Sequence, residues 1–202
     1  MKKLLFTGLI IAMIGLFFIP ARVFSQKYIL GQGSVCSVKG SSTLHDWNVT
    51  IGKVSGEITL DKSFTKKASP AKGAVIAAGN ISFEVKSMDG GRGAVMNDKI
   101  YNAFQSEKNP NVVFTLVKAT VTEVKTDGSF TLNATGNLTM AGNTQSISFP
   151  LTGKKGTDGR YNFTGEKSLD MTTYGMEPPS AMFGQIETGK DVTLIFNLFF
   201  GA

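Results

Sequence analysis

Apolar and polar side chains alternate with a period of two along most of this chain. In the run from residue 129 to 141, Phe130, Leu132 and Leu138 occupy alternate positions, with threonine and asparagine between them. Successive side chains of a β-strand point to opposite faces, so this period predicts strands with one apolar face. The same alternation recurs in the segments 45–51, 81–85, 112–116, 147–151, 161–171 and 192–200.

Turn residues separate these segments, including Asp-Gly at 127–128 and 158–159 and Thr-Gly at 188–189. Their spacing predicts about eight strands of an antiparallel barrel or sandwich. Only the segment 94–104 has helical periodicity, and no βαβ alternation is present, which argues against a nucleotide-binding α/β fold. The fold class is therefore all-β. The pattern alone leaves barrel and sandwich open, because both cover the apolar face of the sheet.

The first 25 residues have the three-part layout of a secretory signal peptide. Lys2 and Lys3 precede an apolar run from residue 4 to 19, and small residues follow around position 25. The run is 16 residues long, whereas a spanning helix needs about 20. We expect cleavage after residue 25, a mature domain at 26–202, an exported protein in the periplasm or secreted, and no membrane span after cleavage. An uncleaved anchor is the alternative.

Charge and composition exclude several classes of function. The full chain has a net charge of +6, but loss of residues 1–25 removes three of its 21 basic residues and none of its 15 acidic ones. The remaining +3 is ordinary for a soluble protein and predicts no nucleic-acid partner. One cysteine and one histidine exclude a disulfide framework, a multi-cysteine zinc site and a two-histidine metal motif within the chain. We expect no metal and no cofactor.

His45-Asp46-Trp47 is the triplet with the most chemistry to offer. In a strand, His45 and Trp47 would share a face and Asp46 would point away, which disfavours a His–Asp catalytic pair. The favoured interpretation is Trp47 as a core or lumen wall, with a headgroup hydrogen bond from His45 as the alternative. No Gly-x-Ser-x-Gly nucleophile motif is present, and the glycines at 31–33 and 90–93 form no complete phosphate-binding loop. The chain is not expected to be an enzyme.

Four segments together resemble the YceI-like family of exported, lipocalin-like, polyisoprenoid-binding proteins. They cover nearly all of residues 27–200 in order, and lie at 41–58, 92–114, 136–144 and 169–176. The third reads GNLTMAGNT and is similar to a Gly-x-Leu-Thr-x-x-Gly-x-Thr hairpin of that family. The resemblance implies an eight-stranded antiparallel barrel whose apolar lumen binds an isoprenoid lipid or quinone. Pairing of two such barrels into a homodimer through their exterior faces stays open.

If the resemblance holds, the inward positions of the strands and of the helical insertion line the lumen. The predicted ligand-binding residues are Trp47, Phe83, Tyr101, Phe104, Phe114, Leu138, Met140, Phe149, Phe163, Leu169, Met171 and Phe196. His45 and Lys167 are the candidates for contact with a lipid headgroup.

Three functions remain from the sequence. The first is a lipid carrier or storage module, the second a structural or interaction protein with a filled core, and the third an enzyme acting on a lipid or quinone. The apolar segment 177–184 is interpreted either as a lid over the barrel mouth or as a loop packed on the barrel.

Overall fold

The computed structural model describes residues 25–65 and 69–202, so the expected signal peptide at 1–25 lies outside the described residues save for its last position. The strands are β1 (Gln26–Leu30), β2 (Val35–Ser42), β3 (Trp47–Ile51), β4 (Val54–Leu60), β5 (Val75–Glu84), β6 (Met88–Asp89), β7 (Asn111–Val124), β8 (Phe130–Met140), β9 (Asn143–Lys155), β10 (Tyr161–Asp170), β11 (Ser180–Ala181) and β12 (Ile186–Gly201). The α-helices are α1 (Lys62–Thr65) and α2 (Ala94–Ala103), and three 3-10 turns are η1 (Val85–Ser87), η2 (Met171–Tyr174) and η3 (Met182–Gly184).

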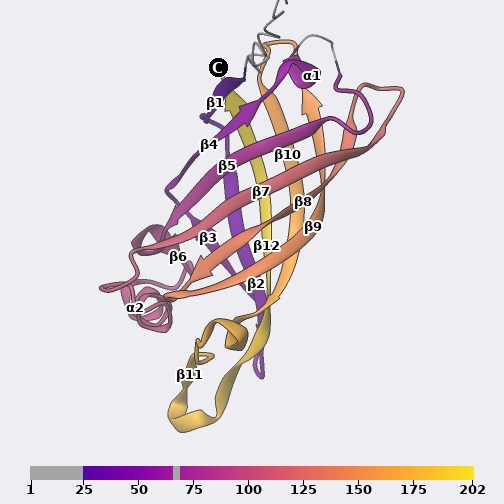
Figure 1. The fold of residues 1–202 in the computed structure, drawn as a ribbon. Helices are drawn as coiled ribbons and strands as arrows, with labels where there is room; N and C mark the ends of the chain where they lie inside the picture. The colour runs from indigo at the N-terminus through magenta and orange to yellow at the C-terminus, as the bar shows by residue number, and fades with distance from the viewer. Residues whose placement is uncertain (1–24, 66–68) are drawn as a thin grey trace, which may run out of the picture.

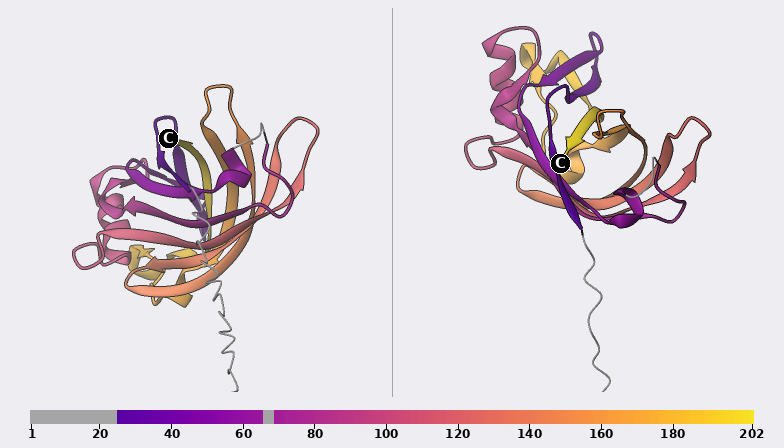
Figure 2. Two further views of the ribbon diagram at one scale, coloured as in Figure 1. Left: turned by 45° about the horizontal axis from the view of Figure 1, so that its top comes forward. Right: turned by 90° about the horizontal axis from the view of Figure 1, so that it is seen from above.

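Eight of the strands close into an antiparallel barrel, in the order β1-β4-β5-β7-β8-β9-β10-β12 (Figure 1). Pairing of β1 with β12 completes the ring and decides for a barrel over a sandwich. Figure 2 shows the sheet curving around its own interior. Strand β12 pairs with β1 only at its last residues, and its earlier residues, 188–197, pair with β2. Strands β3 and β6 extend that part of the wall. The predicted all-β barrel with a short helical insertion is confirmed.

The period-two pattern places the apolar side chains inside the barrel. In β8 every second residue, from Phe130 to Met140, is buried, while the intervening threonines and asparagines are partly or fully exposed. In β8 and in β10 a glycine takes an inward place and an aromatic ring fills the space instead. A Cβ added at Gly136 would lie 2.5 Å from Phe114, and one at Gly165 would lie 2.7 Å from Phe196. Both glycines are therefore required by packing.

One end of the barrel is sealed by aromatic rings. Phe64 of α1 is fully buried and meets Phe130 and Tyr161 edge-on, at centroid distances of 6.0 and 6.3 Å. The Tyr161 hydroxyl donates to the Phe64 carbonyl oxygen at 2.6 Å, and burial raises the pKa of Tyr161 to about 12. Residues 62–74 are rich in lysine, serine, alanine and proline, so the sequence predicts a loop there. The structure instead forms α1 at its start, and four residues are too few to show helical periodicity. Helix α1 is nonetheless the plug of this end.

The opposite end carries α2, the β2–β3 connection and a projecting segment, residues 177–187, which we call the arm (Figure 1). Helix α2 begins and ends within one residue of the predicted segment. The predicted strand 45–51 starts later than expected, because His45 lies in the β2–β3 connection and β3 begins at Trp47. The Ser42 hydroxyl accepts from the backbone N–H of His45 at 3.2 Å, which holds this connection in a turn instead of a strand.

Candidate ligand-binding cavity

Two adjoining cavities occupy the barrel below the aromatic plug. The mouth cavity has a volume of about 260 Å³ and lies at the end that carries α2 and the arm, whereas the inner cavity has a volume of about 80 Å³. Both are lined by Phe83, Leu138, Leu169 and Leu194, so they meet inside the barrel. Together they reach the lower end of the range for small-molecule sites, about 300–1,000 Å³. The interior is therefore neither solid nor open at both ends.

Methionines and aliphatic side chains form most of the wall of the mouth cavity. Five methionines line it, namely Met88, Met96, Met140, Met171 and Met176. Methionine is unbranched and polarisable, so a wall of this kind adapts to the bends of a flexible apolar chain. Residues from α2, the β2–β3 connection and the arm complete the rim, which makes the mouth a junction of several separate segments.

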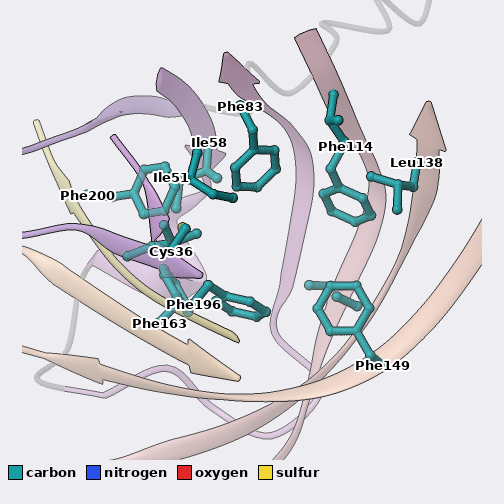
Figure 3. Close-up of a cluster of buried hydrophobic side chains, with 14 of the residues drawn as sticks. Cys36, Ile51, Ile58, Phe83, Phe114, Leu138, Phe149, Phe163, Phe196 and Phe200 are labelled. Carbon is teal, nitrogen blue, oxygen red and sulfur yellow. The ribbon is translucent and has the colours of Figure 1, made fainter. Parts of the chain in front are cut away.

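Six of the residues that line the inner cavity are phenylalanines. The Phe149 ring lies between those of Phe114 and Phe196, at centroid distances of 5.7 and 5.9 Å (Figure 3). Beyond them Phe163 packs edge-on against Phe130 and Phe200, which belong to the sealed end. The passage from the mouth thus narrows between aromatic rings and then stops.

The barrel wall has a gap on the side of the inner cavity. Strand β10 pairs with β9 only as far as Gly165 and Leu151, whereas its pairing with β12 continues to Asp170. In the unpaired stretch Lys167 lines the inner cavity and its Nζ donates to the Ser148 carbonyl oxygen at 3.3 Å. Lys167 therefore spans the gap, and its ammonium group is the charged group of the inner cavity wall.

The polar groups of the mouth cavity are cationic or neutral. His45, Arg92 and Lys99 line it, and no carboxylate is among its described lining residues. The Lys99 Nζ donates to the carbonyl oxygen of Ser180 at 3.0 Å, which ties α2 to the arm. The His45 Nδ1 lies 2.9 Å from the backbone carbonyl oxygen of Asp46, and the Asp46 side chain is absent from the described lining. No His–Asp pair forms at this site.

Trp47 forms part of the mouth wall. Its ring lies against Gly40, the residue paired with it in β2, and its Nε1 donates to the Ser41 carbonyl oxygen at 2.9 Å. A side chain at position 40 would collide with the ring. Gly40 therefore allows the indole to lie flat at the rim of the cavity.

The structure brings most of the predicted residues to the cavities. Those lining the mouth cavity are His45, Trp47, Phe83, Phe104, Leu138, Met140, Leu169 and Met171. Those lining the inner cavity are Phe83, Phe114, Leu138, Phe149, Phe163, Lys167, Leu169 and Phe196. His45 and Lys167 thus belong to different cavities.

Tyr101 lines neither cavity. Its hydroxyl donates to the backbone carbonyl oxygens of Lys86 and Met88 at 3.0 and 3.1 Å, so it fastens α2 to the β5–β6 segment. The expectation that Tyr101 faces the lumen is not met, because the helix turns Met96, Lys99 and Ile100 toward the mouth instead.

Several lining residues were missed from the sequence. Leu194 shares the strand parity of Phe196, and Met96 and Ile100 lie on the apolar face that the periodicity of 94–104 predicts. The sequence pattern could therefore have identified these three residues as lining residues. Arg92 and Lys99 reach the mouth only because α2 folds over it. Nothing in their local sequence marks that position.

The chain's one cysteine lines neither cavity. Cys36 is buried in β2, and burial raises the pKa of its thiol to about 12, which keeps it protonated and unreactive. Across residues 25–65 and 69–202, no three histidine, cysteine or acidic side chains gather closely enough to hold a metal ion. In the same part of the chain, no helix has the length and apolarity needed to cross a bilayer.

The tip of the arm holds two large apolar side chains in solvent. Met182 is 64% exposed and Phe183 is fully exposed. Their φ angles of 49° and 54° are left-handed, which costs about 1–2 kcal/mol per residue for side chains of this kind. Tight turning of the backbone is maintained by a hydrogen bond from the Gln185 N–H to the Met182 carbonyl oxygen at 3.2 Å.

Comparisons with known proteins agree with this geometry. A family model described as the YceI-like domain matches residues 31–200. The fold matches BcnA of Burkholderia cenocepacia at 17% identity and a TM-score of 0.62, covering 82% of this chain and 95% of that one. It matches a polyisoprenoid binding domain from Saccharophagus degradans, implicated in plant cell wall breakdown, at 12% identity and a TM-score of 0.66, covering 87% and 98%. The YCEI protein of Campylobacter jejuni matches at 16% identity and a TM-score of 0.54, covering 76% and 84%. No curated protein matches the chain.

Proposed function

Because the chain belongs to the YceI-like family and its barrel holds an apolar cavity that opens at the end opposite the aromatic plug, we propose that it binds an extended amphiphilic lipid there. The tail, an isoprenoid chain or the side chain of an isoprenoid quinone, occupies the two cavities, and the headgroup stays at the mouth. The protein acts as a carrier or store and performs no chemistry on its cargo. Of the solved structures with this fold, one is a polyisoprenoid binding domain, which supports the same class of ligand.

Desolvation of the tail supplies free energy of the same size as the cost of association. Burial of a CH₂ group is worth about 0.8 kcal/mol, so about fifteen buried carbons contribute roughly 12 kcal/mol. Association costs about 4–15 kcal/mol, so a long tail is needed for tight binding and a short one is not retained. The enzyme alternative lacks a paired acid and base, since His45 and Lys167 line different cavities.

The observation that carries the proposal is the asymmetry of the barrel. Aromatic rings close one end, while the other opens between α2, the β2–β3 connection and the arm, where His45, Arg92 and Lys99 offer hydrogen-bond donors. A molecule with one apolar tail and one polar end fits this arrangement. The signal-like residues 1–25 support its action outside the inner membrane, in the periplasm or beyond.

Lipid extraction from the purified protein, followed by mass spectrometry, tests this function. We expect wild-type protein to release one isoprenoid lipid or quinone per few chains. The variant Leu138→Glu puts a charge where the two cavities meet and should retain at least tenfold less. The matched control is Asn137→Glu, the neighbouring residue of β8, whose side chain is exposed on the outer face.

Because Leu138→Glu is also expected to weaken the fold, Leu194→Trp provides a second variant that fills the cavity without adding charge. Circular dichroism establishes which variants are folded. Retention of the lipid by folded Leu194→Trp and Leu138→Glu at the wild-type level would contradict the proposal, and so would an extract of wild-type protein without lipid.

A further inference from the structure

Four of the eight large apolar side chains that are exposed among the described residues belong to segments around the cavity mouth. Met182 and Phe183 lie at the tip of the arm, Leu44 in the β2–β3 connection and Val95 in the first turn of α2, and all four are exposed. Phe183 is the one aromatic residue among the exposed large apolar side chains of the described residues. These three segments all supply lining residues of the mouth cavity, and Leu44 is itself one of them.

The arm has an uncharged tip and a base that is held by hydrogen bonds. The segment 180–186 reads SAMFGQI and contains no charge, while Glu177 and Glu187 flank it. Its base is fixed to the β2–β3 connection, where the Thr43 N–H donates to the Glu187 carbonyl oxygen at 3.0 Å. The backbone is left-handed at Met182 and Phe183, and both side chains are exposed at this turn. Figure 1 shows the arm extending past the barrel at the end opposite α1.

We propose that the arm tip, led by Phe183 and Met182, inserts into the surface of a lipid bilayer and seats the cavity mouth on it, so that lipid passes between membrane and barrel. This rests on the proposed lipid cargo, because a tail of that length leaves a membrane into water only rarely. A second copy of this chain is a poor occupant. Two side chains bury far less than the roughly 800 Å² per partner of a stable protein interface.

The charges near the tip define the kind of surface. Glu177 and Glu187 are the first and last residues of the arm, and the cations Arg92 and Lys99 line the mouth. Neither sign dominates at the insertion point, so attachment depends on the apolar side chains. We therefore expect binding to zwitterionic phosphatidylcholine vesicles that persists in 0.5 M salt, where exposed charges are strongly screened.

Co-sedimentation with phosphatidylcholine vesicles tests the proposal on the protein purified from the full chain. Phe183→Ser should lower the vesicle partition constant about tenfold or more, whereas Val124→Ser should change it less than twofold. Val124 is the matched control because it is an exposed apolar residue at the end of β7, beside the turn 125–129. All proteins must share one N-terminus, checked by intact mass, because residues 4–19 are apolar and would bind vesicles themselves.

Phe183→Trp gives a direct signal of insertion. The chain has one tryptophan, so this variant adds a second, whose emission should shift to shorter wavelength with vesicles and be quenched by brominated lipid. Three results would each overturn the proposal. Phe183→Ser could bind vesicles as the wild type does, or Val124→Ser could lose as much vesicle binding as Phe183→Ser. The third is binding only to anionic vesicles that is lost in 0.5 M salt.

Lipid extraction separates this proposal from the proposed cargo. Folded Phe183→Ser should still contain the extracted lipid but exchange it with vesicles more slowly. Vesicle binding that depends on Phe183 in a protein without extractable lipid would defeat the cargo and leave the docking surface standing. Retained lipid with vesicle binding that ignores Phe183 would defeat the docking surface alone.

Discussion

Two buried tyrosines show how the same hydroxyl group has opposite effects in different surroundings. Tyr161 donates to the Phe64 carbonyl oxygen and so joins β10 to the helix that seals the barrel. The Tyr174 hydroxyl is buried and has no hydrogen-bond partner among the described residues. A buried polar group without a partner has lost its hydration and gained nothing in return.

Replacing each tyrosine by phenylalanine therefore has a different expected outcome. Tyr161→Phe leaves a buried carbonyl without its donor and should lower the free energy of unfolding by about 1–3 kcal/mol. Tyr174→Phe should leave it unchanged or raise it by up to about 1 kcal/mol. Urea unfolding of both variants measures the difference, and an equal loss in the two would contradict this assignment of the hydrogen bonds.

At the scale of elements, the connection between β10 and β12 is held at its base by one carboxylate. Asp170 accepts from the Thr172 N–H at 2.9 Å, which starts η2, and forms an ion pair with Lys190 at 2.7 Å. These hydrogen bonds, that from Lys190 first, hold the pKa of Asp170 at about 2. The whole segment from η2 to the arm tip leaves and re-enters the barrel at this pair.

The depressed pKa makes this base sensitive to acid. The stabilising contribution of Asp170 is complete above about pH 4, the usual pKa of an unfolded aspartate, and is lost as the pH falls toward 2. Wild-type protein should thus lose more thermal stability between pH 5 and 2 than Asp170→Asn does. Thermal melts followed by circular dichroism check this, with Asp46→Asn, an exposed carboxylate, as the control. Identical slopes in wild type and Asp170→Asn would rule out the linkage.

The aromatic plug of the barrel sets an upper limit on the length of the lipid tail in the proposed complex. Phe149 and Phe196 lie where the inner cavity narrows before the sealed end. Truncating such a residue leaves a cavity and costs about 3–5 kcal/mol of stability. The interior space then reaches deeper from the mouth.

Phe149→Ala should therefore shift the preferred ligand toward longer tails. A competition series of polyprenols of increasing length, read by mass spectrometry of the retained lipid, measures the preference. Phe64→Leu is the comparison, because it changes the plug beyond the inner cavity and removes far less volume. An unchanged length profile in folded Phe149→Ala would show that the inner cavity does not hold the end of the tail.

The sequence predicts this barrel well where one rule governs. Strand parity identifies the inward residues of β8 and β12, because a closed sheet has only two faces. The sequence-based prediction fails where tertiary packing decides the position of a side chain. Tyr101 is an example, because its hydroxyl donates to backbone carbonyl groups outside the lumen. The plug at Phe64 and the cations of the mouth depend on how connections fold over the ends of the barrel, and residue patterns carry no record of that.

For the proposed lipid cargo, the sealed end also sets the orientation in which the molecule enters and leaves. A lipid that enters by the mouth goes in tail first and leaves tail last, and its polar end does not reach the sealed end. Under the proposed membrane docking, the same face of the protein takes up the lipid and releases it. In this proposal, uptake and release of the lipid are the same step in opposite directions.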